Sequence, residues 1–494
     1  MNDVSPHPDA HPHWWLPSLS ATIWVVMFLG LSLTSARTVL ISADSDPAWH
    51  RVLGNWMIQH HAIVREYNLL HTIHGPLLTK EWLSEVLFAV AANALGWNGV
   101  VLVAATLIAT CFWLLHRQLL AEGTEAGFAT VLVLMAMFAC SIHWIARPFL
   151  FTHLLTLVFA WQLRWFQRDR VSARQLFALL PLLMILWVNL HGAFMTGLIL
   201  IGMYALGSTI SGWRRPAAGH KPGTLWALLL VCVVALLVNP NSWALPAHLV
   251  SFLQSRELAT LTTENASLNF HIPILHGFSL LLFVLALVLL IIRPKLDATD
   301  VLLVGGWGYF ALLYGRNVSI FALVVTPLLA QWLTELAQTH RECTMQVTAI
   351  NRTADAATIL AAIVCGVLLI KSRIATDFPS DRYPTAAVDY LRAHPEAVHG
   401  EMFNALLWGG YMEFYLPGRK PFIDSRNDFY GIDLVRDFAI PDGPKAGWKA
   451  VFARYNVGWT ILPVQHPLNR ILELSPDWTL VFSNQQALVF SHVS

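Results

Sequence analysis

Two acidic residues one position apart stand out in a chain that is apolar almost everywhere else. The stretch "ADSDPAWH", residues 43–50, places Asp44 and Asp46 directly after the first long hydrophobic run. A carboxylate about 3 Å from a hydroxyl can act as its general base, and paired carboxylates can instead hold a divalent cation through oxygen ligands. A structural alternative is a helix cap, for which Asp46 before Pro47 is the better candidate. A cap and a catalytic group are compatible.

Further polar residues interrupt the apolar runs in small clusters. They are His50 beside the acidic pair, Lys80 with Glu81, Arg147, Asn189 with His191, Asn239 with Asn241, Glu264, and Arg316 with Asn317. Polar groups at membrane depth are costly and usually face a cavity or a partner. Each of these residues also has a structural alternative. An arginine can extend its charged group to the membrane surface or pair with a carboxylate. His191 can be a buried histidine whose hydrogen bonds are all made within the protein, and the two asparagines can bind backbone near Pro240.

The composition indicates the environment in which these clusters lie. The chain has 494 residues, of which 56% are hydrophobic and 12% charged, and its mean hydropathy is +0.55. Soluble domains carry about twice that charged fraction. No basic block suggests nucleic acid as a partner, so the sequence predicts a polytopic α-helical membrane protein whose partner is the lipid bilayer.

Eleven apolar runs are long enough, or nearly so, to cross a bilayer. They lie near 19–37, 99–116, 126–143, 149–164, 175–190, 193–211, 223–239, 275–292, 299–314, 317–337 and 355–371. A shorter run, 81–96, is predicted to be a partial or interfacial helix. We therefore expect about 11 spans plus one partial helix in residues 1–374, with a long first outer loop at about 38–80.

Basic loops predict the orientation. The loops at 164–174, 213–221, 293–295 and 340–352 are separated by even numbers of spans, so all four can be cytoplasmic together. Counting from them places the N-terminus inside and every polar cluster at the outer end of a span. The sequence thus predicts a multi-pass protein of the bacterial inner membrane with a polar site at its outer face.

The last part of the chain, residues 375–494, changes character. Short apolar strands alternate with polar helices, which predicts a small periplasmic α/β domain. Gly409 and Gly410 are expected to permit a tight turn. In "FIDSRNDFYG", Asp424, Arg426 and Asp428 could touch a ligand, but internal pairing that closes the domain onto the membrane part is the favoured interpretation.

The five cysteines form no CxxC pair, and the histidines form no helical HxxxH pair beside an acid, so the sequence indicates neither disulfides nor zinc.

Taken together and in order, short motifs give the chain a resemblance to a known superfamily. They are "DSDPAWH", "GNWMI", "KEWLSEV", "ARPFLF", "WVNLHG", "VNPNS", "GRNVSIF", "WGGY" and "FIDSR". This series resembles the GT-C integral membrane glycosyltransferases, and more closely a bacterial branch of GT-C-like proteins.

The resemblance implies transfer of a sugar from a polyprenyl-phosphate-linked donor to an acceptor at the outer face. Asp44 and Asp46 would be catalytic or would bind Mg²⁺ or Mn²⁺, the only cofactor expected. Substrate contacts would come from Trp49, His50, Lys80, Glu81, Arg147, His191, Arg316 and Asn317. Arginine suits the phosphate because its planar fork pairs with two oxygens. Competing hypotheses are a non-catalytic GT-C-like scaffold and a transporter of lipid-linked glycans, although no internal repeat supports the transporter.

Overall fold

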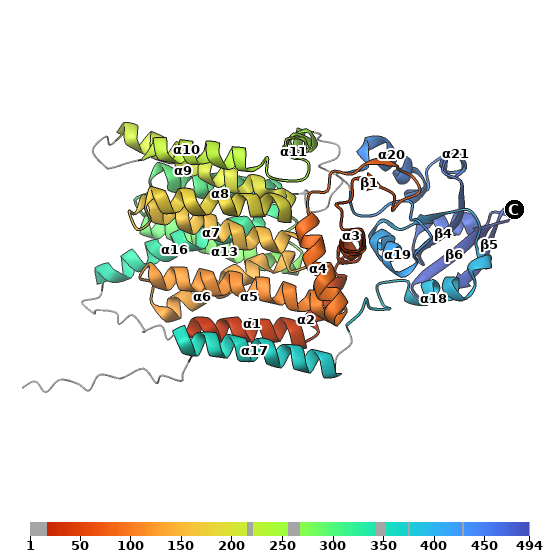
Figure 1. Cartoon of the computed structure of the whole chain (residues 1–494), viewed down its shortest axis with the longest axis horizontal. Coiled ribbons are helices and arrows are strands. Elements are labelled where there is room, and N and C mark those ends of the chain that lie inside the picture. Colours follow the sequence, from red (N-terminus) through yellow and green to blue (C-terminus); the bar gives the residue numbers. More distant parts are fainter. Residues whose placement is uncertain are drawn as a thin grey trace, which may run out of the picture.

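The computed structural model describes residues 17–214, 221–254, 267–340, 352–373, 376–426 and 429–493. Within these ranges the chain forms a long helical bundle with a small mixed domain at one end (Figure 1). Glu264, Asp428 and most of the basic loop 340–352 lie outside the described residues.

Eight described helical segments are long and apolar enough to cross a bilayer, which makes this a multi-pass membrane protein. They are built on α5 (Trp97–Ala121), α6 (Ala126–Cys140), α7 (Phe149–Gln167), α8 (Ala173–Leu190), α9 (Met195–Arg214), α13 (His276–Leu287), α16 (Val318–His340) and α17 (Arg352–Arg373).

The remaining predicted runs are also helical but shorter or bent. The first run is divided into α1 (Leu19–Leu33) and α2 (Ala36–Ser42), which meet at 71°. The run near 223–239 holds the shorter α10 (Pro222–Ala235), followed by α11 (Ala244–Gln254). The run near 299–314 is the composite helix Ala298–Leu313, whose π-helical centre η6 (Leu302–Gly306) separates α14 (Ala298–Val301) from α15 (Trp307–Leu313).

The basic loops gather at the end of the bundle opposite the small domain. Arg168, Lys221 and Lys295, from three of the four loops, line one polar cavity of about 270 Å³. A buried ion pair closes this end, with Arg164 Nε 2.9 Å from Glu122 Oε2. The prediction that these loops share one side of the bundle is therefore confirmed for the described residues.

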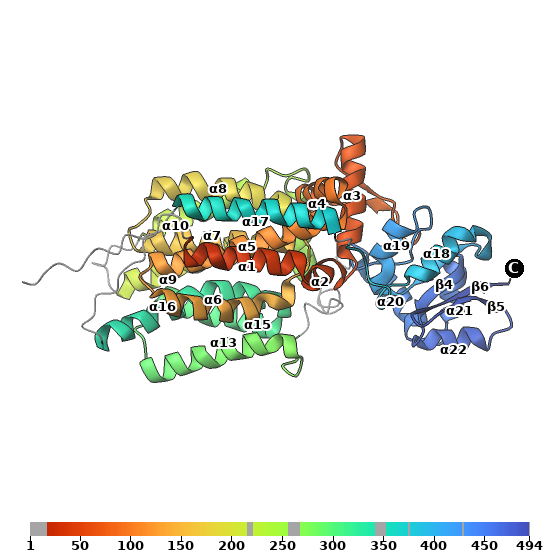
Figure 2. The ribbon, with the colours of Figure 1, turned by 90° about the horizontal axis from the view of Figure 1, so that it is seen from below.

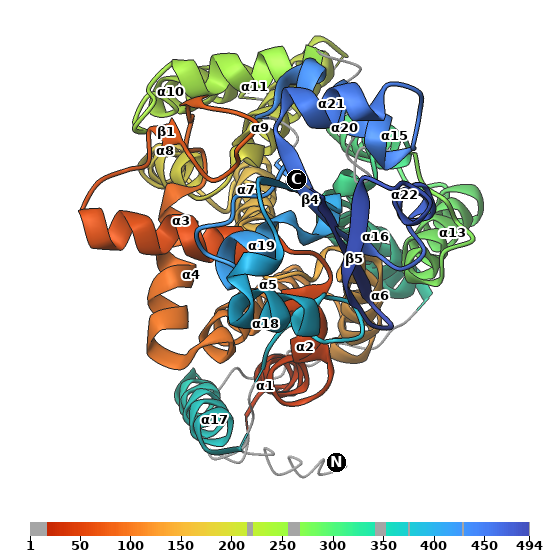
Figure 3. The same cartoon turned by 90° about the vertical axis from the view of Figure 1, so that its right-hand side faces the viewer.

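At the other end, two helices lie across the bundle rather than along it. These are α3 (Asp46–His60) and α4 (Trp82–Leu95), which pack on each other and lie between the bundle and the domain (Figures 2 and 3). A two-stranded hairpin of β1 (Glu66–Tyr67) and β2 (Gly75–Pro76) connects them. The predicted first outer loop is therefore an ordered layer.

The small domain has one four-stranded mixed sheet with the order β3-β4-β6-β5. Its strands are β3 (Glu401–Asn404), β4 (Val457–Pro463), β5 (Trp478–Ser483) and β6 (Ala487–His492), and only β3 and β4 are parallel. Its helices are α18 (Thr385–Ala393), α19 (Gly409–Tyr415), α20 (Gly431–Asp442), α21 (Trp448–Arg454) and α22 (Pro467–Glu473).

The core of this domain continues into the crosswise layer. Trp49, Leu53 and Met57 from one face of α3 belong to the same buried apolar cluster as Phe403 and Phe422 of the domain. Their spacing of four residues places them on one helix face. Burial of these side chains fixes the rotation of α3, and hence the direction of its polar residues.

Gly409 and Gly410 serve close packing rather than the predicted tight turn. Both begin α19 with negative φ angles, as Gly409 has φ −54° and Gly410 is not among the positive-φ glycines. A Cβ on Gly409 would lie 2.2 Å from the carbonyl oxygen of Ile423, and one on Gly410 would lie 2.6 Å from that of Ser45. Gly410 therefore lets α19 touch the start of α3 directly, and Gly409 lets it touch the backbone at Ile423 and Asp424.

Candidate active site

The acidic pair meets Arg147 at the junction of bundle and crosswise layer. Arg147 Nη1 lies 3.1 Å from Asp44 Oδ2 and 2.9 Å from Asp46 Oδ2. Arg147 precedes α7, whereas both acids lie at the turn between α2 and α3, so two separate bundle segments are joined. The sequence alternative in which Arg147 pairs with carboxylates is thus what the structure shows.

The cap interpretation of Asp46 is wrong. The N-cap position of α3 is Ser45, whose side chain makes no capping hydrogen bond, and Asp46 is the first helical residue. Asp44 instead binds one of the free backbone N–H groups at the start of the helix, because its Oδ1 accepts a hydrogen bond from the Asp46 backbone N–H at 3.1 Å. The carboxylate of Asp46 is thereby left for tertiary contacts.

The small domain reaches the acidic pair through Ser425 and Arg426. The hydroxyl of Ser425 donates to Asp46 Oδ1, which also accepts from Trp49 Nε1 at 3.2 Å. The Arg426 guanidinium stacks over the Trp49 ring, 4.7 Å from its centroid, as a cation–π pair. Trp49 is 6% exposed and so is a wall of the site, with little free surface for a sugar ring.

Arg426 is itself fixed by two buried acids of the domain. Its Nε donates to Asp424 Oδ2 at 2.7 Å, and its Nη2 also contacts Glu413. Burial raises the pKa of Glu413 well above its ordinary value, although Arg426 opposes this. Burial would raise the pKa of Asp424 as well, but the charge of Arg426 together with the hydrogen bonds from Glu413 and Arg426 outweighs burial and holds this pKa below its ordinary value. The favoured structural interpretation of this motif is confirmed for Asp424 and Arg426.

His191 supports Glu81 through a defined tautomer. The Ala193 backbone N–H donates to His191 Nδ1 at 3.3 Å, so Nδ1 is an acceptor. Thr152 Oγ1 lies 2.9 Å from the same nitrogen and itself accepts from Trp187. Nε2 of the neutral ring therefore carries the proton, and it points to Glu81 Oε1 at 3.4 Å. His191 is a positioned group rather than an isolated buried histidine.

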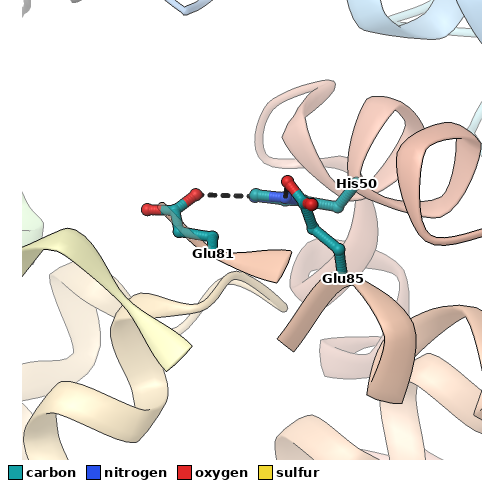
Figure 4. Close-up of side chains that lie close together, drawn as sticks. All are labelled: His50, Glu81 and Glu85. Atoms are coloured by element: carbon teal, nitrogen blue, oxygen red, sulfur yellow. Dashed lines mark ion pairs between the residues drawn. The ribbon is translucent and has the colours of Figure 1, made fainter. Parts of the chain in front are cut away.

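Next to this pair, His50 and Glu85 complete a buried cluster (Figure 4). His50 Nδ1 lies 3.5 Å from Glu85 Oε1, and His50 Nε2 lies 4.0 Å from Glu81 Oε2. Burial, then the nearby Arg147 and Arg426, lowers the pKa of His50 well below its ordinary value. Burial and Glu81 raise the pKa of Glu85 to about 8. His50 is therefore a neutral ring with a lone pair to offer.

The other predicted contacts lie around this centre at different depths. Lys80 is half-buried, and a Cβ on Gly192 would lie 3.3 Å from its Cδ. Arg316 and Asn317 are in the short 3₁₀ turn η7 (Gly315–Asn317), where Asn317 Nδ2 donates to the Phe310 carbonyl at 3.2 Å. Their predicted contacts with substrate stay predictions.

The acidic pair does not fit a divalent cation in this arrangement. The Arg147 guanidinium occupies the position between Asp44 Oδ2 and Asp46 Oδ2 that a shared cation would take. Each carboxylate already has a permanent positive partner. We therefore assign no metal-dependent step to Asp44 and Asp46.

Sequence reasoning missed Glu85, Glu413 and Ser425. The signal for Glu85 was present: Glu81 and Glu85 are four residues apart at the start of an apolar helix, and so are Asp46 and His50 on the preceding one. A search for HxxxH on a single helix could not find a cluster shared between two helices.

Comparison with known proteins shows the fold. No protein-family model matches the chain, and no match is found among curated sequences. Among solved structures, the archaeal oligosaccharyltransferase AglB from Archaeoglobus fulgidus matches with a TM-score of 0.52 and 12% identity, over 96% of this chain and 74% of AglB. The arabinofuranosyltransferase AftD from Mycobacteria matches with a TM-score of 0.50 and 14% identity, over 96% of this chain but 39% of AftD. The chain therefore has the GT-C fold.

Proposed function

We propose that this protein is a glycosyltransferase that moves a sugar from a polyprenyl-phosphate-linked donor to an acceptor at the outer face of the membrane. The observation that carries the proposal is the acidic pair at the junction of bundle, crosswise layer and domain, within a GT-C fold. The AglB structure, which holds a dolichol-phosphate, supports a lipid phosphate as the donor class.

The two acids have different surroundings and hence different proposed roles. Asp46 is held by Arg147, Trp49 and Ser425, which suits a positioning group. Asp44 is the proposed general base. It takes the proton of the acceptor hydroxyl while that oxygen bonds to the anomeric carbon, and the bond from that carbon to the phosphate oxygen breaks. Polyprenyl phosphate leaves with the bonding electrons. Arg147 holds both carboxylates in place through its contacts with Asp44 Oδ2 and Asp46 Oδ2.

An apolar groove offers a path for the polyprenyl chain. It has a volume of about 540 Å³ and is lined by Trp82, Leu83, Leu182, Ile185, Leu186, Asn189 and residues 237–240. Several of its side chains are exposed, including Leu182 at 66% and Val238 at 54%, and such a surface favours lipid. At one end the groove is polar. There Trp82 Nε1 donates a hydrogen bond to Asn189 Oδ1 at 2.7 Å.

The polar end of the groove is next to the site, because Trp82 of the groove directly follows Lys80 and Glu81 of the site in the sequence. We place the donor chain in the groove and its phosphate near Lys80, with Arg316 as a second candidate contact. The proposed orientation puts this end of the bundle, with the small domain, on the periplasmic side of a bacterial inner membrane. Clustering of three basic loops at the opposite end supports it.

The test is release of polyprenyl phosphate from synthetic donors. Proteoliposomes with the purified protein receive undecaprenyl-phosphate-linked hexoses and pentoses with a cell-envelope extract as acceptor, and free undecaprenyl phosphate is measured by mass spectrometry. We expect Asp44→Asn to lower the rate about 100-fold or more. Asp169→Asn is the matched control, since Asp169 has a side chain 74% exposed at the opposite end.

A second measurement separates binding from catalysis. Undecaprenyl phosphate should raise the melting temperature of wild type, and less so that of Lys80→Met. Stabilisation without release from any donor would favour the non-catalytic scaffold, and absence of both would refute the proposal.

A further inference from the structure

We infer that His50, Glu81 and Glu85 form a binding site for one divalent transition-metal ion, of the class of Zn²⁺ and Mn²⁺, that clamps α3 to α4. This inference lies beside the proposed active site and does not need sugar transfer to be correct. It replaces the metal expected at Asp44 and Asp46, where Arg147 already serves as the cation.

The three side chains converge from two helices. One ligand atom of each lies within 4.8 Å of the others, and Figure 4 shows the imidazole of His50 between the two carboxylates. Metal–ligand distances of about 2.0–2.2 Å place neighbouring ligands about 3–3.5 Å apart. An ion would thus draw these side chains inward by about 1 Å, which side-chain rotation can supply.

Burial without hydrogen bonds is the second observation. His50 and Glu85 are each 2% exposed. Yet His50 Nδ1 and Glu85 Oε2 have no hydrogen-bond partner among the described residues. A buried polar atom without a partner costs about 1–3 kcal/mol. Two such atoms in one cluster, one a nitrogen and one a carboxylate oxygen, are ligand atoms that an ion would satisfy.

Charge around the cluster also favours a cation. The carboxylates near the junction are Asp44, Asp46, Glu81, Glu85, Glu413 and Asp424, against the permanent cations Lys80, Arg147 and Arg426. Carboxyl groups outnumber permanent bases by two to one in this largely buried region. A bound divalent ion would supply a positive partner for the carboxylates of Glu81 and Glu85.

The ligand types select the class of metal. One imidazole nitrogen with carboxylate oxygens suits Zn²⁺ and Mn²⁺, whereas Mg²⁺ and Ca²⁺ prefer oxygen ligands alone. Supporting contacts are also in place, because the N–H of His191 Nε2 orients Glu81 at 3.4 Å, and Thr152 orients His191 in turn. Such partners commonly hold metal ligands in their productive rotamers.

The consequence of the clamp is positional. His50 is four residues after Asp46, so the two side chains lie on one face of α3, about one helical turn apart. Joining His50 to α4 would therefore fix the position of α3 along its own axis and its rotation about that axis, and with them the position of Asp46 and its neighbour Asp44. The ion is proposed to hold the site together rather than to take part in proton transfer.

The experiment measures metal binding on the full-length protein in detergent. Protein treated with a chelator and dialysed is titrated with Zn²⁺, Mn²⁺ or Mg²⁺, with binding followed by calorimetry and stability by thermal melting. We expect one equivalent of Zn²⁺ or Mn²⁺ to bind and to raise the melting temperature, with Mg²⁺ at least about 100-fold weaker. Metal analysis of the protein as purified gives an independent check.

Matched variants locate the ion. Glu85→Gln keeps the shape of the side chain and should weaken Zn²⁺ binding by about 100-fold or more, while its melting temperature in chelator equals that of wild type or exceeds it. His60→Gln, at the exposed end of the same helix α3, should bind like wild type. Binding that survives in both Glu85→Gln and His50→Asn would overturn the inference.

Failure of the two proposals can be told apart. Zn²⁺ and Mn²⁺ that neither bind nor stabilise wild type would show that the cluster is neutralised by a shared proton instead, and would leave sugar transfer untouched. A protein that binds the ion but transfers no sugar would support the metal site and refute the proposed glycosyltransferase activity.

Discussion

Replacement of Arg147 by glutamine tests whether the acidic pair depends on this guanidinium. The side chains of Arg147, Asp44 and Asp46 are 17%, 15% and 12% exposed, so the triple is largely but not wholly buried. Removing one partner of a buried ion pair costs about 3–5 kcal/mol. With a reduction for the residual exposure, we expect Arg147→Gln to lower the free energy of unfolding by about 3 kcal/mol.

The corresponding thermal shift follows from chain length. An unfolding entropy of about 2.1 cal/mol/K per residue gives about 1 kcal/mol/K for this chain of 494 residues. The melting temperature should therefore fall by about 3 °C. Transfer activity should fall further, by about 100-fold, because carboxylates displaced by about 1 Å lose their catalytic geometry.

A matched control and a double variant identify the cause. Arg164→Gln breaks the more deeply buried pair with Glu122 at the opposite end of α7, whose side chains are 7% and 4% exposed, so it should cost at least as much stability and leave kcat unchanged. Adding Asp44→Asn to Arg147→Gln removes one uncompensated charge and should restore about half of the lost stability. The reasoning is refuted if Arg147→Gln melts within 1 °C of wild type, or if Asp44→Asn destabilises it further.

Three further changes probe the contact between the domain and the crosswise layer. Gly410→Ala forces a Cβ to 2.6 Å from the Ser45 carbonyl oxygen and should cost about 1–3 kcal/mol in a melting experiment, whereas Gly202→Ala, with nothing within 4 Å, should be neutral or stabilising. Ser425→Ala removes one hydrogen bond to Asp46 and should cost about 1 kcal/mol; this cost should disappear in an Asp46→Ala background, which has no acceptor for the hydroxyl. Burial lowers the pKa of His71 from 6.5, against the opposing effect of its bond to the Met402 carbonyl. Because the folded state prefers the neutral ring, its stability contribution is complete above pH 6.5 and is lost as pH falls below that value; His71→Gln should flatten the dependence of melting temperature on pH in this range.

Apolar length predicted the positions of the membrane helices but not the number of spans, because eight described segments, or nine with the bent pair, are long enough to cross a bilayer against eleven expected. Apolar runs alone located the helices, because burial in lipid requires unbroken apolar length whatever the neighbours. The same reasoning predicted that Asp44, Arg147 and His191 share one end of the bundle, and the structure brings these residues to one junction. Segment length was less certain: the composite helix Ala298–Leu313 contains a π-helical centre that no run of hydrophobic letters reveals.

Contacts between distant parts of the chain were beyond such reasoning. The partner of Asp46 in the domain is Ser425, 379 residues away, and nothing local in either segment indicates the pairing. Gly409 and Gly410 resembled turn glycines because their packing partners belong to other elements. The cluster of His50, Glu81 and Glu85 was hidden for the same reason, since its spacing is regular only within each helix.

The core shared between α3 and the small domain sets an order of events during synthesis. Trp49, Leu53 and Met57 emerge early, but Phe403 and Phe422, which cover them, are made more than 340 residues later. At about 5–20 residues per second, this interval is roughly 20–70 s. During this interval, the newly made crosswise layer exposes an apolar face at the membrane surface. A ribosome stalled before residue 400 would therefore leave a substrate for chaperones or proteases, and full assembly has to wait for the end of the chain.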